Sequence, residues 1–336
     1  MDNRERVIRE IVFDRKDYIP HSISFNTGIY QRMKEYTGIS DYQAETGSHI
    51  TEISLMKPEK ELRPGYFEDE YGVVWNRTGA DKDVGVVDNL VIAEPEQIAA
   101  YHVPKVDEAY VRSRMEWLEA QADGNFHMPA ISFSLFERAW TLCGMENLLC
   151  YMITDPDAVH ELMKKICERN LEVIDIALQY EIDGFYFGDD WGQQKGLIMG
   201  PGYWREFVKP YMAKMYGKVK EAGKYIAQHS CGDLRDIMDD VIDMGLNIYQ
   251  TYQPEIYGLE YAECLKGRLC IWGGISTQAD LPYKTPQEIK KITQKLLAAF
   301  PEGGLIAAPT HGIPDDVPPE NVEAMMEVLL GQKGRQ

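Results

Sequence analysis

The sequence has no excess of positive charge and no long hydrophobic run. Its 336 residues carry 35 Lys and Arg against 54 Asp and Glu, which gives a formal net charge of −19. Nucleic acids and anionic membrane surfaces are bound by basic footprints, so both partners are disfavoured. No apolar stretch reaches the roughly 18 residues of a membrane-spanning helix. No signal-peptide core follows the polar residues 1–6. We therefore expect a cytoplasmic protein.

The chain also lacks paired cysteines and a dinucleotide fingerprint. Its six cysteines form no Cys-x-x-Cys pair and are scattered: Cys143, Cys150, Cys167, Cys231, Cys264 and Cys270. Most lie in apolar contexts, where a free cysteine behaves as a small core residue. This pattern predicts a reducing compartment without a disulfide framework. The missing Gly-rich fingerprint argues against a doubly wound open sheet, the alternative α/β fold.

Strands and helices alternate along the chain. Eight apolar runs are candidate strands, several of them buried on both faces as in a parallel sheet: 21–25, 49–55, 130–135, 184–189, 225–229, 247–252, 269–273 and 304–308. Helix start signals lie between them, including Asp155-Pro156 and the capping box of Thr285 and Glu288. This order predicts an α/β fold, a (β/α)8 TIM-type barrel spanning 1–336 as a single domain. We expect an N-terminal extension at 1–18 and an insertion at about 57–126.

Three residues at predicted strand ends have the side chains of a zinc site. His229 and Cys231 lie two apart, so in an extended chain they point to the same side. His311 also closes an apolar run and, like Cys231, precedes a glycine. Three protein ligands with one open position are typical of catalytic zinc. A lone His-x-Cys is a weak signal, and the second histidine at a matching strand end strengthens it.

Other polar residues also fall at the carboxyl ends of strands, where barrel enzymes gather their active sites. Asp189 and Asp190 are candidate catalytic residues that orient substrate, relay a proton or add a fourth zinc ligand. The alternative is that one of them caps the next helix. Further candidates for the pocket lining, against the alternative of plain core or rim packing, are Asn26, Tyr30, Trp191, Gln250, Gln253, Gln278, Tyr252 and Trp272.

Several motifs together resemble the uroporphyrinogen decarboxylase superfamily. They are Asp189-Asp190-Trp191-Gly192, Met199-Gly200-Pro201, His229-Ser230-Cys231-Gly232, Gln253-Pro254, Trp272-Gly273-Gly274-Ile275, Pro309-Thr310-His311-Gly312 and Pro319-Glu320-Asn321, with Ser134-Leu135-Phe136-Glu137-Arg138 and Gly144-Met145-Glu146-Asn147-Leu148-Leu149 upstream. The resemblance spans most of the chain and implies a single TIM-type barrel with an N-terminal extension.

The superfamily has two chemical branches. Its decarboxylases bind a tetrapyrrole without metal and carry Arg-Gln-Ala-Gly-Arg near the first strand. Here the matching region, 24–30, contains no arginine, and the first one after it is Arg32. A polycarboxylate substrate needs several cationic partners. The other branch, the zinc-dependent corrinoid methyltransferases, has His-x-Cys at a strand end, as His229 and Cys231 match. Its third ligand is commonly Cys, where this chain has His311.

The resemblance therefore implies a zinc-dependent methyltransferase of a corrinoid system. It would move a methyl group between a small methylated substrate and the cobalt of a corrinoid protein. The chain has no Asp-x-His-x-x-Gly corrinoid-binding segment, so the cobalamin would come with a partner. Two histidines and one thiolate leave zinc more electropositive than one histidine and two thiolates, which favours cleavage of a methyl ether.

Other functions remain open from the sequence. A methylcorrinoid:thiol methyltransferase of the coenzyme M type would use the same site in the opposite direction. A metal-free lyase similar to uroporphyrinogen decarboxylase and a non-catalytic binding module are the further alternatives. The missing arginines count against the lyase, and the retained His229 and Cys231 count against the binding module. The oligomeric state and the methyl donor are not predicted.

Overall fold

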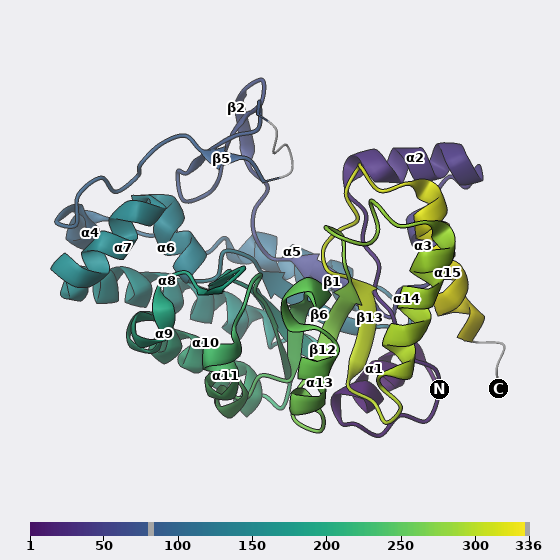
Figure 1. Ribbon diagram of the computed structural model, residues 1–336. Helices are drawn as coiled ribbons and strands as arrows, with labels where there is room; N and C mark the ends of the chain where they lie inside the picture. Colours follow the sequence, from purple (N-terminus) through teal and green to yellow (C-terminus); the bar gives the residue numbers. More distant parts are fainter. Residues whose placement is uncertain (80–83, 333–336) are drawn as a thin grey trace.

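The protein is built around a curled parallel sheet covered by helices (Figure 1). The computed structural model describes residues 1–79 and 84–332. Seven strands follow one another in the order β1 (Ile50–Ser54), β6 (Phe126–Ile131), β7 (Gly184–Gly188), β10 (Tyr225–His229), β11 (Ile248–Tyr252), β12 (Cys270–Ile275) and β13 (Leu305–Pro309). Every pair of neighbours is parallel, so all their carboxyl ends lie at one rim. The predicted α/β barrel fold is confirmed.

The eighth place of the barrel is taken by the segment around His21. This segment pairs with β13 through parallel bridges of His21 to Ala307 and of Phe25 to Ile313. On its other side, the His49 N–H donates to the His21 carbonyl at 2.9 Å. The run predicted as the first strand therefore lies between β13 and β1, but as two isolated bridges rather than a continuous ladder.

The helices cover the outer face of the sheet. The longer ones are α1 (Asn3–Ile11), α2 (Thr27–Thr37), α5 (Glu108–Glu119), α6 (Phe136–Cys143), α7 (Met145–Thr154), α8 (Pro156–Ala177), α10 (Lys209–Glu221), α14 (Pro286–Ala298) and α15 (Pro319–Gly331). Shorter ones are α3 (Tyr42–Glu45), α4 (Gln97–Ala100), α9 (Gly200–Tyr203), the π-helix η1 (Trp204–Val208), the 3-10 turn η2 (Arg235–Ile237), α11 (Met238–Met244), α12 (Pro254–Tyr257) and α13 (Glu260–Leu265). The predicted capping box of α14 is confirmed, because Thr285 and Glu288 cap each other's backbone.

One predicted strand was misplaced. The run 130–135 was expected to be a strand, whereas β6 spans Phe126–Ile131. Pro129 and the partly exposed His127 disguised the start of this strand, since proline is depleted from central strands. The chain leaves the sheet at Phe133, whose φ of 50° is positive, and enters α6.

The predicted insertion at about 57–126 contains a small antiparallel sheet and two helices, α4 and α5. The sheet runs β2 (Lys60–Arg63), β3 (Tyr66–Glu68), β4 (Val74–Asn76) and β5 (Val86–Val87), and projects away from the barrel in Figure 1. Two ion pairs tie it to the barrel helices, Arg138 to Asp69 and Arg169 to Glu70, both at 2.6 Å. Residues 80–83 of this predicted insertion lie outside the described residues.

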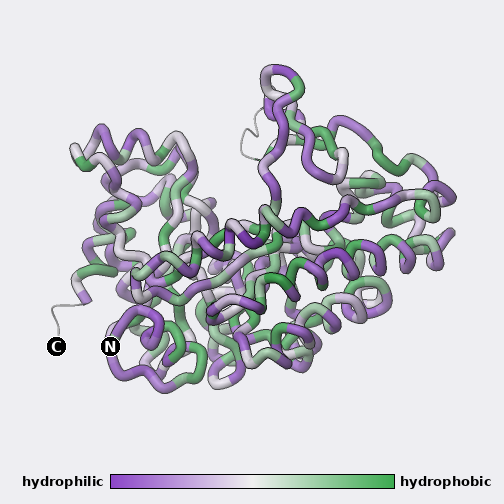
Figure 2. Tube along the Cα trace, turned by 180° about the vertical axis from the view of Figure 1, so that it is seen from behind, coloured by the Kyte–Doolittle hydropathy of each residue, from purple (hydrophilic) through white to green (hydrophobic). Residues whose placement is uncertain are grey.

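Two apolar layers hold the barrel together. One lies between strands and helices, and the other fills the barrel interior below the rim with side chains that alternate along each strand. Val7 and Ile11 of α1 close the lower end of that interior. Figure 2 shows polar residues along much of the outer helix surface and apolar ones toward the sheet. Among the described residues, no helix combines the length and apolarity needed to cross a membrane.

Candidate metal centre

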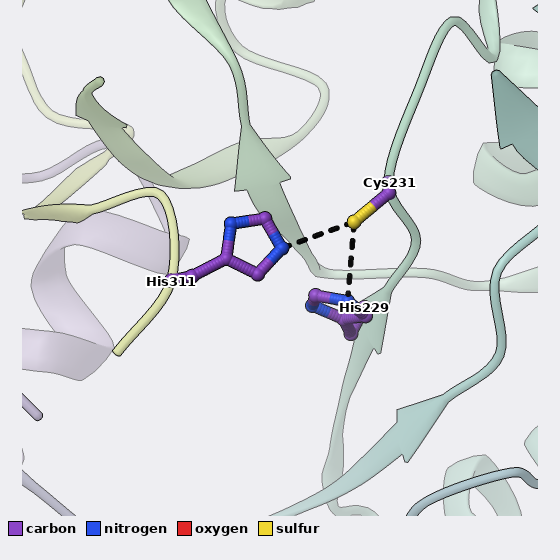
Figure 3. Close-up of side chains that lie close together, drawn as sticks. All are labelled: His229, Cys231 and His311. Atoms are coloured by element: carbon purple, nitrogen blue, oxygen red, sulfur yellow. Dashed lines mark hydrogen bonds between the residues drawn. The ribbon is translucent and has the colours of Figure 1, made fainter. Parts of the chain in front are cut away.

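His229, Cys231 and His311 meet at the rim of the barrel (Figure 3). His229 is the last residue of β10, Cys231 follows two residues later, and His311 follows the end of β13. The Cys231 Sγ lies 3.0 Å from His311 Nε2 and 3.7 Å from His229 Nε2. All three ligand atoms lie within 4.8 Å of one another. The curvature of the barrel thus brings together two strands that are three places apart in the sheet.

These distances fit a tetrahedral zinc ion. Zinc–nitrogen and zinc–sulfur bonds of about 2.0–2.3 Å place neighbouring ligand atoms roughly 3.5 Å apart. The two contacts of Cys231, at 3.0 and 3.7 Å, bracket that separation. The chemistry of the donors, two imidazoles and a thiol, is also what zinc prefers. A tetrahedral zinc held by these three residues would have one further position for a fourth ligand.

A second layer of contacts orients His229. Its Nδ1 donates a hydrogen bond to the Oε1 of Gln250, so Nε2 is the ring nitrogen that faces Cys231. The Tyr186 hydroxyl donates to the same Gln250 oxygen at 2.9 Å, and the Gln250 amide donates to the Thr310 carbonyl at 3.3 Å. Such outer contacts fix the tautomer and the ring plane of metal-binding histidines.

The turn that carries Cys231 is held from several directions. The Gly232 N–H donates to Gln253 Oε1 at 2.8 Å, and the Tyr249 and Tyr257 hydroxyls donate to the carbonyls of Ser230 and Gly232 at 2.9 and 2.8 Å. Gly232 has a φ of +82°, and a Cβ there would overlap the backbone of Gly192. The predicted pocket residue Gln253 thus supports the backbone beside the cluster.

Asp190 joins the cluster. Its Oδ1 accepts the Cys231 N–H at 2.7 Å and lies 3.3 Å from His229 Nε2. Burial opposes both charges, but the mutual hydrogen bond raises the pKa of His229 well above its usual value and keeps that of Asp190 low. Burial raises the pKa of the Cys231 thiol. Burial, together with the charge of His229, lowers the pKa of His311 to about 4. Without metal, Asp190 therefore faces an imidazolium beside a neutral thiol and a neutral imidazole.

Asp189 faces the opposite way. Its carboxylate is fully buried and accepts the N–H groups of Leu135, Phe136 and Glu137 at 3.1, 2.9 and 2.8 Å. The Trp191 indole donates to it at 2.6 Å. Burial raises the pKa of Asp189 to about 6, and these bonds limit the rise. Asp189 thus binds the start of α6, which precedes it in the chain, and not the next helix that the sequence offered as the alternative, with Trp191 as its support.

A match to a protein-family model identifies the family of this chain. The model of the family described as uroporphyrinogen decarboxylase (URO-D) matches residues 78–330, three quarters of the chain. The protein belongs to the URO-D family. The predicted superfamily is thereby confirmed, and its branch stays a prediction.

Relatives and a solved structure agree with the URO-D assignment. The chain is 24% identical to the uroporphyrinogen decarboxylase of Serratia proteamaculans over 264 residues, 72% of this chain and 69% of the relative. It is 26% identical to that of Chlorobium limicola over 271 residues, 75% of this chain and 73% of the relative. A solved methyltransferase from Methanosarcina mazei shares the fold with a TM-score of 0.74 and 16% identity, covering 98% of this chain and 99% of that one.

The cluster of His229, Cys231 and His311 in this URO-D family member opens into a chamber of about 650 Å³ inside the barrel. Gln250 and Trp272, both predicted to line a pocket, lie on its wall with His229 and His311. Asn26 and Gln278 instead line a second hollow of about 490 Å³ at the rim, which shares His311 with the chamber. Tyr30 lines neither hollow, and its hydroxyl reaches the Ser40 carbonyl at 3.3 Å.

Two acidic residues near the centre were not predicted. Glu52, on β1, lines the chamber, where the surrounding protein raises its pKa to about 7 although water reaches it. Glu137 lies beside Asp190, and burial together with the charge of Asp190 raises its pKa well above the usual value. Glu137 belongs to a motif that carried the family resemblance, which was the available signal. Glu52 had none, because an isolated glutamate in a strand is usually on the solvent face.

Proposed function

We propose that this protein is a zinc-dependent methyltransferase that moves a methyl group between a small methylated substrate and the cobalt of a corrinoid protein. The observation that carries the proposal is the convergence of the His229, Cys231 and His311 ligand atoms within 4.8 Å at the barrel rim. This set fits zinc in chemistry and spacing and leaves one position free. The fold shared with a solved methyltransferase agrees with it.

The residues of the site would have separate roles in binding the ion and the substrate. His229, Cys231 and His311 would hold the ion, with Gln250 fixing the His229 ring and Asp190 receiving the Cys231 N–H. Bound zinc would supply a Lewis acid for the negative charge that develops on the substrate heteroatom. The chamber next to His229 and His311 would hold the rest of the substrate and keep bulk water away.

We favour demethylation of a methyl ether. Two neutral imidazoles and one thiolate leave a net charge of +1 on the zinc centre, which suits the stabilisation of an alkoxide or phenoxide leaving group. A second thiolate, as in the usual ligand set of the branch, would lower that charge to zero. Transfer from a methylcorrinoid to a thiol is the alternative at the same site. The corrinoid would be brought to the rim by a separate protein.

The named relatives make uroporphyrinogen decarboxylation the second candidate function. The chamber gives it little support, since its described lining residues include neither Lys nor Arg to pair with propionate groups. Arg32, the first arginine after the first strand position, instead donates to the carbonyls of Asp315 and Val317.

Metal analysis tests the proposal first. Gently purified wild type should carry about one zinc per chain, Cys231→Ala should lose it, and Cys150→Ala, an exposed free cysteine, should keep it. Zinc-loaded protein should then transfer methyl groups from methyl ethers to added cob(I)alamin. The proposal would be overturned if wild-type protein contained no zinc although no chelator was used in its purification. That result would favour the metal-free lyase.

A further inference from the structure

Glu52 is a carboxyl group inside the barrel that no other described residue engages. It lies on β1 two residues after Ile50, and both side chains point inward, as the alternation of a strand requires. Barrel interiors are normally filled by apolar side chains. The Glu52 side chain is instead exposed to the chamber, with no hydrogen-bond or ion-pair partner among the described residues, so water solvates it until a ligand displaces that water. Glu52 is therefore placed to contact whatever the chamber binds.

The chamber is acidic. Among its described lining residues are two carboxyl groups, Glu52 and Asp123, and no Lys or Arg. Asp123 already has partners, because it accepts the Thr51 hydroxyl at 2.6 Å and faces His127 Nε2 at 2.9 Å. Glu52 is thus the one lining carboxyl group of the described chain that is free to act on a substrate. A carboxylate or sulfonate at the Glu52 end of a substrate would be repelled there, and no Lys or Arg of the described lining offsets that repulsion.

The charge of the proposed zinc centre disfavours a cationic substrate. This step rests on the proposed function, since a zinc centre with one thiolate would carry a net charge of +1 on the chamber wall. That charge repels a second cation, and together with an ionised Glu52 it sums to zero. Two aromatic side chains, Tyr186 and Trp272, lie on the same wall with ring centroids 5.5 Å apart. They offer apolar surface to an uncharged ring.

We propose that Glu52 is the specificity-determining residue of the chamber: it accepts a hydrogen bond from a hydroxyl group of an uncharged methylated substrate and excludes anionic analogues. The methoxy oxygen would then lie at the metal centre and the hydroxyl group at β1, across the chamber. The two ends of the substrate would contact residues of different strands. These residues are His229 on β10 and Glu52 on β1.

Four probes of one shape test this selection in zinc-loaded protein by titration calorimetry: 4-methoxybenzyl alcohol, 4-methoxytoluene, 4-methoxybenzoate and 4-methoxybenzylammonium. Wild type should bind the alcohol roughly tenfold more tightly than the benzoate and more tightly than the toluene. Glu52→Gln should close most of the gap between alcohol and benzoate. Glu181→Gln, an exposed carboxylate just before β7, is the matched control and should behave as wild type.

Several outcomes would overturn the proposal. They are equal binding of alcohol and benzoate by wild type, no binding of any probe, tightest binding of the ammonium compound, or an unchanged gap in Glu52→Gln. The wild-type comparison alone is decisive if the variant does not fold. Methyl transfer to cob(I)alamin, measured separately, distinguishes the two proposals. Charge selection without transfer overturns the proposed function only, and transfer without charge selection overturns this inference only.

Discussion

Gln250 and His229 come from neighbouring strands, and the amide oxygen of Gln250 accepts the Nδ1 proton of the His229 ring. This relationship decides which ring nitrogen faces Cys231. Gln250 is itself fixed by the Tyr186 hydroxyl at 2.9 Å. The orientation of His229, a candidate metal ligand, therefore depends on a residue that would not touch a bound ion.

Gln250→Leu should weaken zinc binding while leaving all three ligands in place. Loss of the outer hydrogen bond to a metal-binding histidine typically costs about 10–100-fold in affinity. Competition with a chromophoric chelator would measure this. Gln278→Leu is the control, because Gln278 lines the neighbouring hollow and has no contact with His229 among the described hydrogen bonds. Equal zinc affinity of Gln250→Leu and wild type would contradict the outer-contact role.

Gly232 provides the second prediction. Its positive φ and the closeness of Gly192 leave no room for a side chain in the turn after Cys231. Gly232→Ala should lose zinc and unfold at a lower denaturant concentration, since both the backbone and its neighbour must shift. Gly38→Ala is the control, because Gly38 has a φ of +76° but nothing within 4 Å of the added Cβ. It should cost about 1–2 kcal/mol, the strain of a left-handed backbone alone, and keep full zinc content.

The sequence was sufficient for the features that depend on local chemistry. Most of the strand runs, the capping box of α14 and the His-x-Cys pair follow from residue order. It could not separate Asp189 from Asp190, two identical neighbours in the chain. Only the direction of the backbone after β7 sends one carboxylate to the start of α6 and the other to His229.

The features that the sequence did not predict depend on closure of the barrel by residues far apart in the chain. An isolated glutamate in the run Ile50–Ser54 reads as a solvent-facing residue, so Glu52 gave no signal. In the barrel its side chain instead lies on the inner side of β1, which opens into the chamber. In the same way, residues near His21 pair only through isolated bridges, which no local pattern distinguishes from a full strand.

The third prediction concerns the buried ion pair between Arg138 and Asp69. Their side chains are only 1% and 5% exposed. Arg138→Met should destabilise the protein by about 3–5 kcal/mol, because it leaves the Asp69 charge buried without its partner. Denaturant unfolding measures this. Arg268→Met, which removes the exposed pair with Asp239, should change stability by less than about 1 kcal/mol. Similar losses in both variants would contradict the argument.

The last prediction is a pH dependence of stability that Glu52 causes. The barrel around Glu52 raises its pKa from 4.5, the value of an ordinary glutamate, to about 7, chiefly by partial desolvation, and the charge of His229 opposes the rise. Between these values the folded state holds a proton that the unfolded state has released. The stabilisation is therefore complete below about pH 4.5 and is lost as pH rises through 7.

Glu52→Gln removes this titration, since glutamine stays neutral at every pH. Relative to wild type, the variant should gain stability steadily from pH 4.5 to 7 and keep a constant advantage above it. Urea unfolding at several pH values, with the difference between the two proteins plotted, isolates Glu52 from the other titrating groups. A flat difference for Glu52→Gln would mean that water in the chamber solvates the Glu52 carboxylate as fully as bulk water does.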